Sequence, residues 1–172
     1  VHHLPFPLAK EILSNSLQTI DLKNRYKEIA FQILDTLITA ESYVHRQVNF
    51  RPVLHEAKDI IIDIVGCVVG LQFLGIKEVY YFDHINVGNG KVSFSHGIYD
   101  VPAPATKYIL EKYNFKWKKS NVEAELATPT GVSILAGCNA KRIIAMDGFH
   151  KKSQCKALGN KTNIPVKFYL VR

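Results

Sequence analysis

The sequence predicts a single α+β domain in which N-terminal helices are followed by a mixed sheet with helices packed on it. Apolar residues recur at helical spacing in the first part of the chain, and short strand-like runs alternate with helix starts later on. The 172 residues are 47% hydrophobic and 22% charged, which suits one sizeable core better than two complete domains. We therefore expect residues 1–172 to form one domain.

Two helices are expected first. The stretch PLAKEIL indicates a short helix, and residues 21–46 indicate a long one with Asp21 as a plausible N-cap. The apolar residues of the long helix fall on one face and are predicted to be core rather than ligands: Tyr26, Ile29, Ala30, Ile33, Leu37 and Ala40.

A third helix is predicted in HEAKDIIIDIVGCVVGLQFLG, which is apolar on nearly every side and should stop at Gly75. Asp59, Asp63 and Gln72 interrupt this apolar run. Their presence favours a buried helix over a membrane span.

Strands are expected after the third helix. EVYYFDHINV and GKVSFSH are strand-like runs joined through residues 88–90, and KWKK is a further short strand. TPTGVSILAG predicts a short helix, and KRIIAMDGF and IPVKFYLVR predict closing strands. We find no internal repeat and no linker.

The net charge of +7 raises the possibility of nucleic-acid binding. The densest basic stretch, residues 112–119, interleaves its lysines with Tyr113, Phe115 and Trp117. Such alternation is typical of a half-buried strand, so binding to nucleic acid is the weaker interpretation. The three cysteines are widely spaced, which predicts neither a disulfide framework nor a Cys-x-x-Cys site and favours a reducing cytoplasm.

One face of the third helix carries side chains that could bind a ligand. His55, Asp59 and Asp63 follow one another at intervals of four residues, so they share a face. Asp59 could simply favour the helix start, and Asp63 could pair with a neighbouring cation or hydroxyl. The same stripe could instead organise a metal or a phosphate, and the spacing alone favours the first interpretation.

Two helices are predicted to begin at prolines. In HGIYDVPAPATKYIL, Pro102 and Pro104 allow a helix only from about residues 104–106, with His96 and a flexible Gly97 ahead of it. In ATPTGVSIL, Thr128 is an N-cap candidate and Pro129 takes the first helical position. Unpaired amides at two such helix starts could hold a phosphate or carboxylate, although both could also be merely well-capped helices.

The segments AESYVH, HEAKDIIIDIVG, HGIYDVPAPATKYIL and VEAELATPTGVSIL, in this order, resemble the nickel insertion protein family of the lactate racemase nickel-pincer cofactor pathway. That family typically shows Ala-Glu-Ala-x-Val-His, His-Glu before an Asp-Ile-Val-Gly helix, His-Gly, Val-Pro-Ala-Pro-Ala-Thr and Glu-Leu-x-Thr-Pro-Thr-Gly. NIPVKFYLVR is more loosely similar to its closing strand.

The resemblance implies CTP-dependent insertion of nickel into pyridinium-3,5-bisthiocarboxylic acid mononucleotide, a lyase-class reaction that forms a nickel–carbon bond and nickel–sulfur bonds. It implies CTP with a divalent cation as cofactor and the nickel-free nucleotide as partner. The residues that match the family's motifs divide into a metal-binding group, His55, Glu56, Asp59, Asp63 and His96, and a phosphate-binding group, Thr106, Thr128, Thr130 and Gly131.

The sequence also departs from the family pattern. Val53 stands where the family commonly has a histidine, and GFHKKS replaces a glycine-rich stretch. The chain opens at Val1 without the family's aspartate and glycine-rich beginning, and it lacks the C-terminal domain associated with CTP binding. We therefore expect it to act within a larger protein or with a separate CTP-binding domain. The alternative is a non-catalytic nucleotide- or phosphate-binding domain of the same fold.

Overall fold

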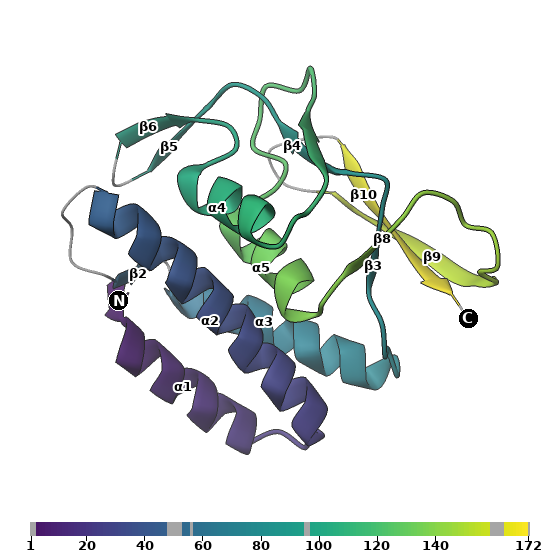
Figure 1. The fold of residues 1–172 in the computed structure, drawn as a ribbon. Coiled ribbons are helices and arrows are strands. Elements are labelled where there is room, and N and C mark those ends of the chain that lie inside the picture. The colour runs from purple at the N-terminus through teal and green to yellow at the C-terminus, as the bar shows by residue number, and fades with distance from the viewer. Residues whose placement is uncertain (1–2, 48–52, 56, 95–96, 159–163, 172) are drawn as a thin grey trace.

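The computed structural model describes residues 3–47, 53–55, 57–94, 97–158 and 164–171, which form the helices and strands drawn in Figure 1. Helices α1 (Phe6–Gln18), α2 (Asn24–Gln47) and α3 (Ala57–Phe73) come first, and α4 (Pro104–Lys112) and α5 (Pro129–Gly137) are interspersed with strands. This arrangement confirms the predicted α+β class.

The described strands pair into five two-stranded sheets rather than one continuous sheet. Three pairs are antiparallel: β1 (His3–Pro5) with β2 (Val53–His55), β5 (Lys91–Phe94) with β6 (Gly97–Asp100), and β9 (Lys151–Leu158) with β10 (Pro165–Val171). Two pairs are parallel: β3 (Tyr80–Phe82) with β8 (Lys141–Ile143), and β4 (Ile85–Gly88) with β7 (Trp117–Lys119). Each parallel pair is closed by a crossover that contains a helix, as parallel strands require.

Two apolar clusters form the core. The first packs α1 and the N-terminal part of α2 against α3, with Leu13, Ile33 and Ile64 fully buried. The second packs the C-terminal part of α2 against β4, α4 and α5, through residues such as Val87 and Ile109. Helix α2 belongs to both clusters and therefore joins the two halves of the molecule (Figure 1).

Helix α3 differs from the predicted buried helix. Only one face, with Ala57, Ile61, Ile64 and Val68, is buried. On the rest of its surface Ile62 is 68% and Phe73 is 87% exposed. The predicted end is confirmed, since Gly75 follows the helix with a φ of 67° that favours glycine.

The start of α2 also differs from the prediction, because the helix begins at Asn24 rather than after an Asp21 cap. At this point the side chain of Gln72, from α3, forms hydrogen bonds to the main chain of both Asp21 and Lys23. Its Nε2 donates to the Asp21 carbonyl at 2.6 Å, and its Oε1 accepts from the Lys23 amide at 2.7 Å. The polar residue in the apolar run thus secures the turn between two helices.

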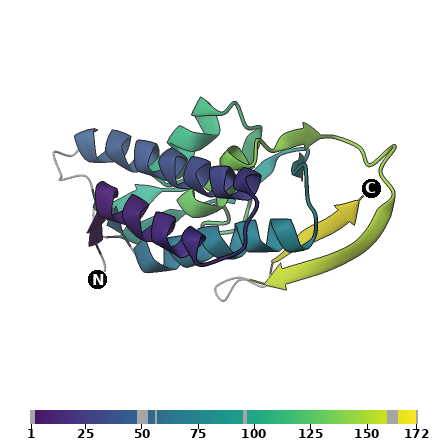
Figure 2. The same cartoon turned by 90° about the horizontal axis from the view of Figure 1, so that it is seen from below.

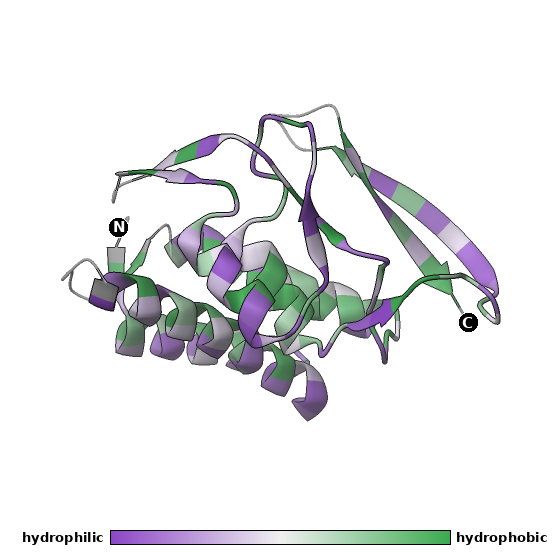
Figure 3. Cartoon of the chain, turned by 45° about the horizontal axis from the view of Figure 1, so that its top comes forward, coloured by the Kyte–Doolittle hydropathy of each residue, from purple (hydrophilic) through white to green (hydrophobic). Residues whose placement is uncertain are grey.

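Strands β9 and β10 form a long antiparallel pair that lies to one side of the helices (Figure 2). The side chains of β9 are exposed throughout. Cys155 lies opposite Phe168 and Ala157 opposite Val166, so these residues share one apolar face, whereas Lys156 and Lys167 lie on the other. The alternation is visible as changing colours along β9 (Figure 3). Within the described residues, no helix is both long and apolar enough to cross a membrane.

Candidate functional site

The two proline-led helix starts lie side by side. Thr106, in the first turn of α4, is fully buried, and its hydroxyl donates to the Ala127 carbonyl at 3.4 Å. Ala127 directly precedes the N-cap of α5, so this hydrogen bond joins the beginning of one helix to the beginning of the other. The structure therefore brings the start of α4 at residues 104–106 together with residues 127–129 at the start of α5.

The loop after β4 lies against the same region. The Leu126 amide donates to the Val87 carbonyl at 3.1 Å, and the Asn89 amide donates to the Ala124 carbonyl at 3.3 Å. A Cβ on Gly88 would lie 1.8 Å from the Ala124 carbonyl oxygen, and Gly88 has a φ of 83°. Both facts require glycine here, because only a bare backbone can approach so closely in this conformation.

The start of α5 is capped as its sequence predicts. Thr128 is the N-cap, its Oγ1 accepts from the Gly131 amide at 3.2 Å, and Pro129 takes the first helical position. The predicted free amide of Gly131 is therefore already bonded within the protein. Thr128 and Gly131 are exposed and Thr130 is half-buried, so these residues can be reached from solvent.

The start of α4 is different, because its N-cap position is Ala103 and no side chain caps it. Pro104 has no amide hydrogen, and Ala105 and Thr106 after it are 5% and 0% exposed, so the uncapped amides of α4 lie beneath the surface. Thr106 itself is buried and faces Ala127 rather than solvent. The predicted direct contact of Thr106 with a phosphate is therefore not supported, and its hydroxyl instead holds the two helix starts together.

The proposed metal-binding residues are only partly described. Asp59 and Asp63 are exposed on α3, and Asp59 lies in its first turn. In the described part of the chain neither carboxylate forms a hydrogen bond or an ion pair, so the expected cation or hydroxyl partner of Asp63 is absent there. The His55 backbone lies in β2, while its side chain, Glu56 and His96 fall outside the described residues. The described residues alone contain no group of three or more ligands suited to a metal.

A buried pair that was not predicted as part of the site lies in the AESYVH segment. His45 Nε2 is 3.6 Å from Glu41 Oε2, and the two side chains are 1% and 17% exposed. Burial raises the pKa of Glu41 to about 7. Such a carboxyl can accept and return a proton near neutral pH, and perturbed groups of this kind gather at functional sites.

The end of α2 that carries this pair is packed against α4. Tyr43 and Tyr108 stack with ring centroids 4.5 Å apart, and Ala40 and Val44 belong to the same core cluster as Ala127. Described residues of AESYVH, HGIYDVPAPATKYIL and VEAELATPTGVSIL therefore meet around this cluster, whereas Ala57, Ile61 and Ile64 of HEAKDIIIDIVG belong to the other. The sequence signal for Glu41 was its place in the motif, four residues before a histidine.

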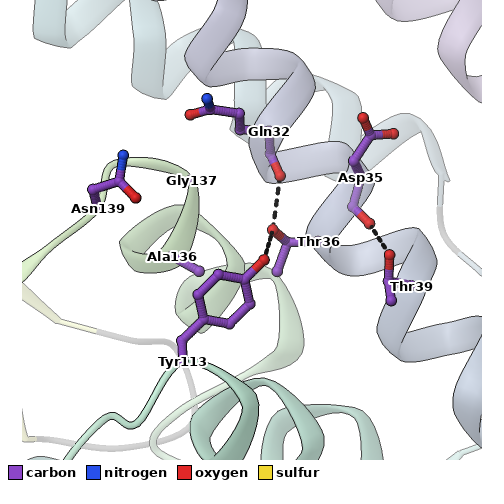
Figure 4. Close-up of a pocket in the computed structure, with 8 residues that line it drawn as sticks. All are labelled: Gln32, Asp35, Thr36, Thr39, Tyr113, Ala136, Gly137 and Asn139. Carbon is purple, nitrogen blue, oxygen red and sulfur yellow. Dashed lines mark hydrogen bonds between the residues drawn. The ribbon is translucent and has the colours of Figure 1, made fainter.

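A separate polar pocket of about 320 Å³ lies elsewhere, between α2 and the ends of α4 and α5 (Figure 4). Tyr113 and Thr36 hydroxyls are 3.0 Å apart, and Thr36 donates to the Gln32 carbonyl at 2.8 Å, so Tyr113 is the donor to Thr36. No residue of the predicted site lines this pocket.

Comparison with known proteins identifies the relatives of this chain. A model of the family described as "Nickel insertion protein" matches residues 6–166. The chain is 38% identical over 125 residues to a pyridinium-3,5-bisthiocarboxylic acid mononucleotide nickel insertion protein of Staphylococcus saprophyticus, covering 70% of this chain and 31% of the relative. It is 41% identical over 116 residues to the protein of the same name from Thermotoga petrophila, covering 66% and 29%. The chain thus spans about a third of the length of these relatives. No solved structure matches it.

Proposed function

The chain belongs to the nickel insertion protein family, and we propose on that basis that it takes part in inserting nickel into pyridinium-3,5-bisthiocarboxylic acid mononucleotide. That substrate appears in the names of the relatives from Staphylococcus saprophyticus and Thermotoga petrophila. The observation that most supports the proposal is the convergence of the two helix starts at Thr106 and Ala127. Segments far apart in the sequence meet there at two dipole-positive helix ends.

The substrate phosphate is proposed to bind at these helix starts. The accessible Thr128, Thr130 and Gly131 would face the anion, and the buried start of α4 would support them from beneath. Thr106 would act indirectly, by holding α4 against the residue that precedes Thr128.

Nickel is a substrate of this reaction, and we propose that it is delivered by the stripe at the beginning of α3. Imidazole suits nickel, so His55 and His96 are proposed as its direct ligands. Glu56, Asp59 and Asp63 would supply carboxylates beside them, and the exposure of Asp59 and Asp63 leaves both free to reach a metal.

The finer parts of the activity are further proposals. We propose a lyase-class reaction that depends on CTP with a divalent cation and occurs in the cytoplasm. A separate CTP-binding domain, in the same protein or in a complex, would complete the site. Since the chain spans about a third of its relatives, these features belong to the proposed assembly and not to the described residues alone.

The runner-up is a non-catalytic domain that binds a nucleotide or phosphate through the same fold. Nickel binding distinguishes the two, since the runner-up has no need of a metal.

The metal proposal is tested by equilibrium dialysis against nickel. We expect His55→Ala and His96→Ala each to lower nickel uptake, and His150→Ala to leave it unchanged, because His150 is exposed and lies outside the four segments that resemble the family. Undiminished uptake in both variants would remove the metal assignment and leave the runner-up.

The phosphate proposal is tested separately by calorimetry with CTP and with the nickel-free mononucleotide. Thr130→Val should weaken binding of the mononucleotide. Thr19→Val is the matched control, because Thr19 lies at the far end of α1 and donates only to the Ser16 carbonyl. Equal affinity in all three proteins would mean that Thr128 and Thr130 merely start a helix.

A further inference from the structure

One face of the β9–β10 pair carries lysines and no acid. Lys156 and Lys167 lie directly opposite each other in the register, and Gln154 and Tyr169 form the next pair on the same side. Lys151 reaches this side too, because its Nζ donates to Gln154 Oε1 and lies 5.4 Å from the centroid of the Tyr169 ring. We call the surface formed by these residues the lysine face.

The positive charge of the lysine face is not balanced within the described part of the chain. Residues 148–172 contain no aspartate or glutamate. Elsewhere an exposed lysine such as Lys10 pairs with Asp35, whereas no described carboxylate lies within ion-pair distance of a lysine of β9 or β10. Lys156 and Lys167 therefore repel each other across the strands, and an anion between them would relieve that repulsion.

The lysine face is long and contains an aromatic ring. Lys151 and Lys156 are separated by roughly 16 Å at the usual rise of a strand, a line matched better by the repeated phosphates of a chain than by the one phosphate of a mononucleotide. The Tyr169 ring lies between these two positions and is 45% exposed. A base outside a duplex can stack on such a ring, and the Lys151 ammonium beside it would neutralise the phosphate of that base.

We propose that the lysine face binds single-stranded nucleic acid, with phosphates at Lys151, Lys156 and Lys167 and a base against Tyr169. An acidic protein segment would also satisfy the lysines but would make no use of the ring, so nucleic acid is the better fit. This surface is separate from the basic stretch at residues 112–119, which ends α4 and contributes to the second core cluster. The function is also independent of nickel insertion.

Fluorescence anisotropy of the whole chain with a labelled oligouridine of about 20 nucleotides, at about 50 mM salt, tests the proposal. We expect binding that weakens as the salt concentration rises. Replacing Lys156 and Lys167 together with Gln should weaken binding by about fivefold or more and reduce the slope of log affinity against log salt by about 1.4. Tyr169→Leu should weaken binding by about fivefold or more through loss of the stacked base.

The matched control replaces Lys118 and Lys119 with Gln, which removes the same charge from exposed positions of β7. This control should bind oligouridine as the unaltered chain does, and so should Thr130→Val, which tests the mononucleotide site instead. Equal losses in the two double-lysine variants would overturn the proposal, because net charge alone would then account for binding.

Absence of binding, or unchanged binding by Tyr169→Leu, would also overturn the proposal. Competition on the unaltered chain decides the matter even if a variant fails to fold. We expect unlabelled oligouridine to displace the probe and uridine monophosphate not to displace it. Displacement by poly-L-glutamate as effective as that by oligouridine would identify the lysine face as a site for an acidic protein segment and contradict the proposal.

Discussion

The hydroxyl of Thr106 and the carbonyl of Ala127, 3.4 Å apart, connect the starts of α4 and α5 inside the core. Thr106 is fully buried and Ala127 is 8% exposed, so water does not substitute readily for either partner. Around this contact lie the exposed N-cap of α5, the uncapped start of α4 and the close approach of Gly88 to Ala124. The site's shape therefore depends on a hydrogen bond that lies beneath its surface.

Replacing Thr106 with Val should lower the free energy of unfolding by about 1 kcal/mol, because the Ala127 carbonyl loses its buried donor. It should also weaken mononucleotide binding, since the two helix starts are no longer tied together. Thr39→Val is the control: Thr39 donates to the Asp35 carbonyl at 2.7 Å within α2, in a hydrogen bond that is exposed to solvent. Urea unfolding compares the two variants. An equal decrease in the free energy of unfolding would show that the Thr106 hydrogen bond stabilises the protein no more than the Thr39 one.

Replacing Gly137 with Ala should destabilise the protein by about 2 kcal/mol or more, because the new Cβ would lie 2.4 Å from Ile33 Cγ1 and 2.8 Å from its backbone nitrogen. Gly66 is the matched control, as it is also helical and a Cβ there meets nothing within 4 Å. Gly66→Ala should stabilise the protein by about 0.5–1 kcal/mol. Thermal unfolding of both variants checks the prediction, and a stabilising Gly137→Ala would mean that α5 can move away from α2.

Glu41 should make stability depend on pH. Burial raises its pKa from 4.5 to about 7 in the folded chain, so the folded state binds more protons than the unfolded state between these values. Its contribution is fully present below pH 4.5 and is lost as the pH rises through about 7. The expected loss is at most about 3 kcal/mol.

The pH effect is measured as the free energy of unfolding of the unaltered chain and of Glu41→Gln from pH 4.5 to pH 8. In Glu41→Gln the free energy of unfolding should no longer decrease as the pH rises over this range. Glu11→Gln, an exposed position on α1, should retain it. Identical curves for Glu41→Gln and the unaltered chain would assign the pH dependence to other groups.

Local patterns predicted much of this fold. Helical spacing located α1 to α3, and Pro129 and Thr128 marked the start of α5 correctly. The strand at KWKK is confirmed at Trp117–Lys119, with Trp117 partly buried and Lys118 exposed, but the alternation that begins at Lys112 is not all strand, because Lys112 ends α4. These features depend on neighbours in the sequence, which is why they can be read from it.

Other features depend on the tertiary structure. KRIIAMDGF forms a strand only at Lys141–Ile143, and β9 was missed because the first half of its sequence, residues 151–154, carries no apolar side chain. The open face of α3 was missed because an all-apolar helix gives no sign of which side is covered.

The candidate site, like the fold, could be predicted only where it depends on local sequence. Motif order indicated which segments matter, and the caps at Thr128 and Pro129 were evident from residue type. That Thr106 turns inward to Ala127, and that Glu41 is buried enough to shift its pKa, follow from packing between elements and could not be read from spacing.

The central claim is that this chain supplies part of a nickel-insertion site that a second domain completes. The direct measurement is mass spectrometry of the nickelated mononucleotide, with CTP consumption, in mixtures of this chain, nickel, CTP and the nickel-free mononucleotide. We expect product only when the C-terminal portion of a relative is added as a separate protein, and less product with His55→Ala than with His150→Ala. Absence of product with every such partner would contradict the claim, and robust turnover by this chain alone would contradict the proposed division of the site.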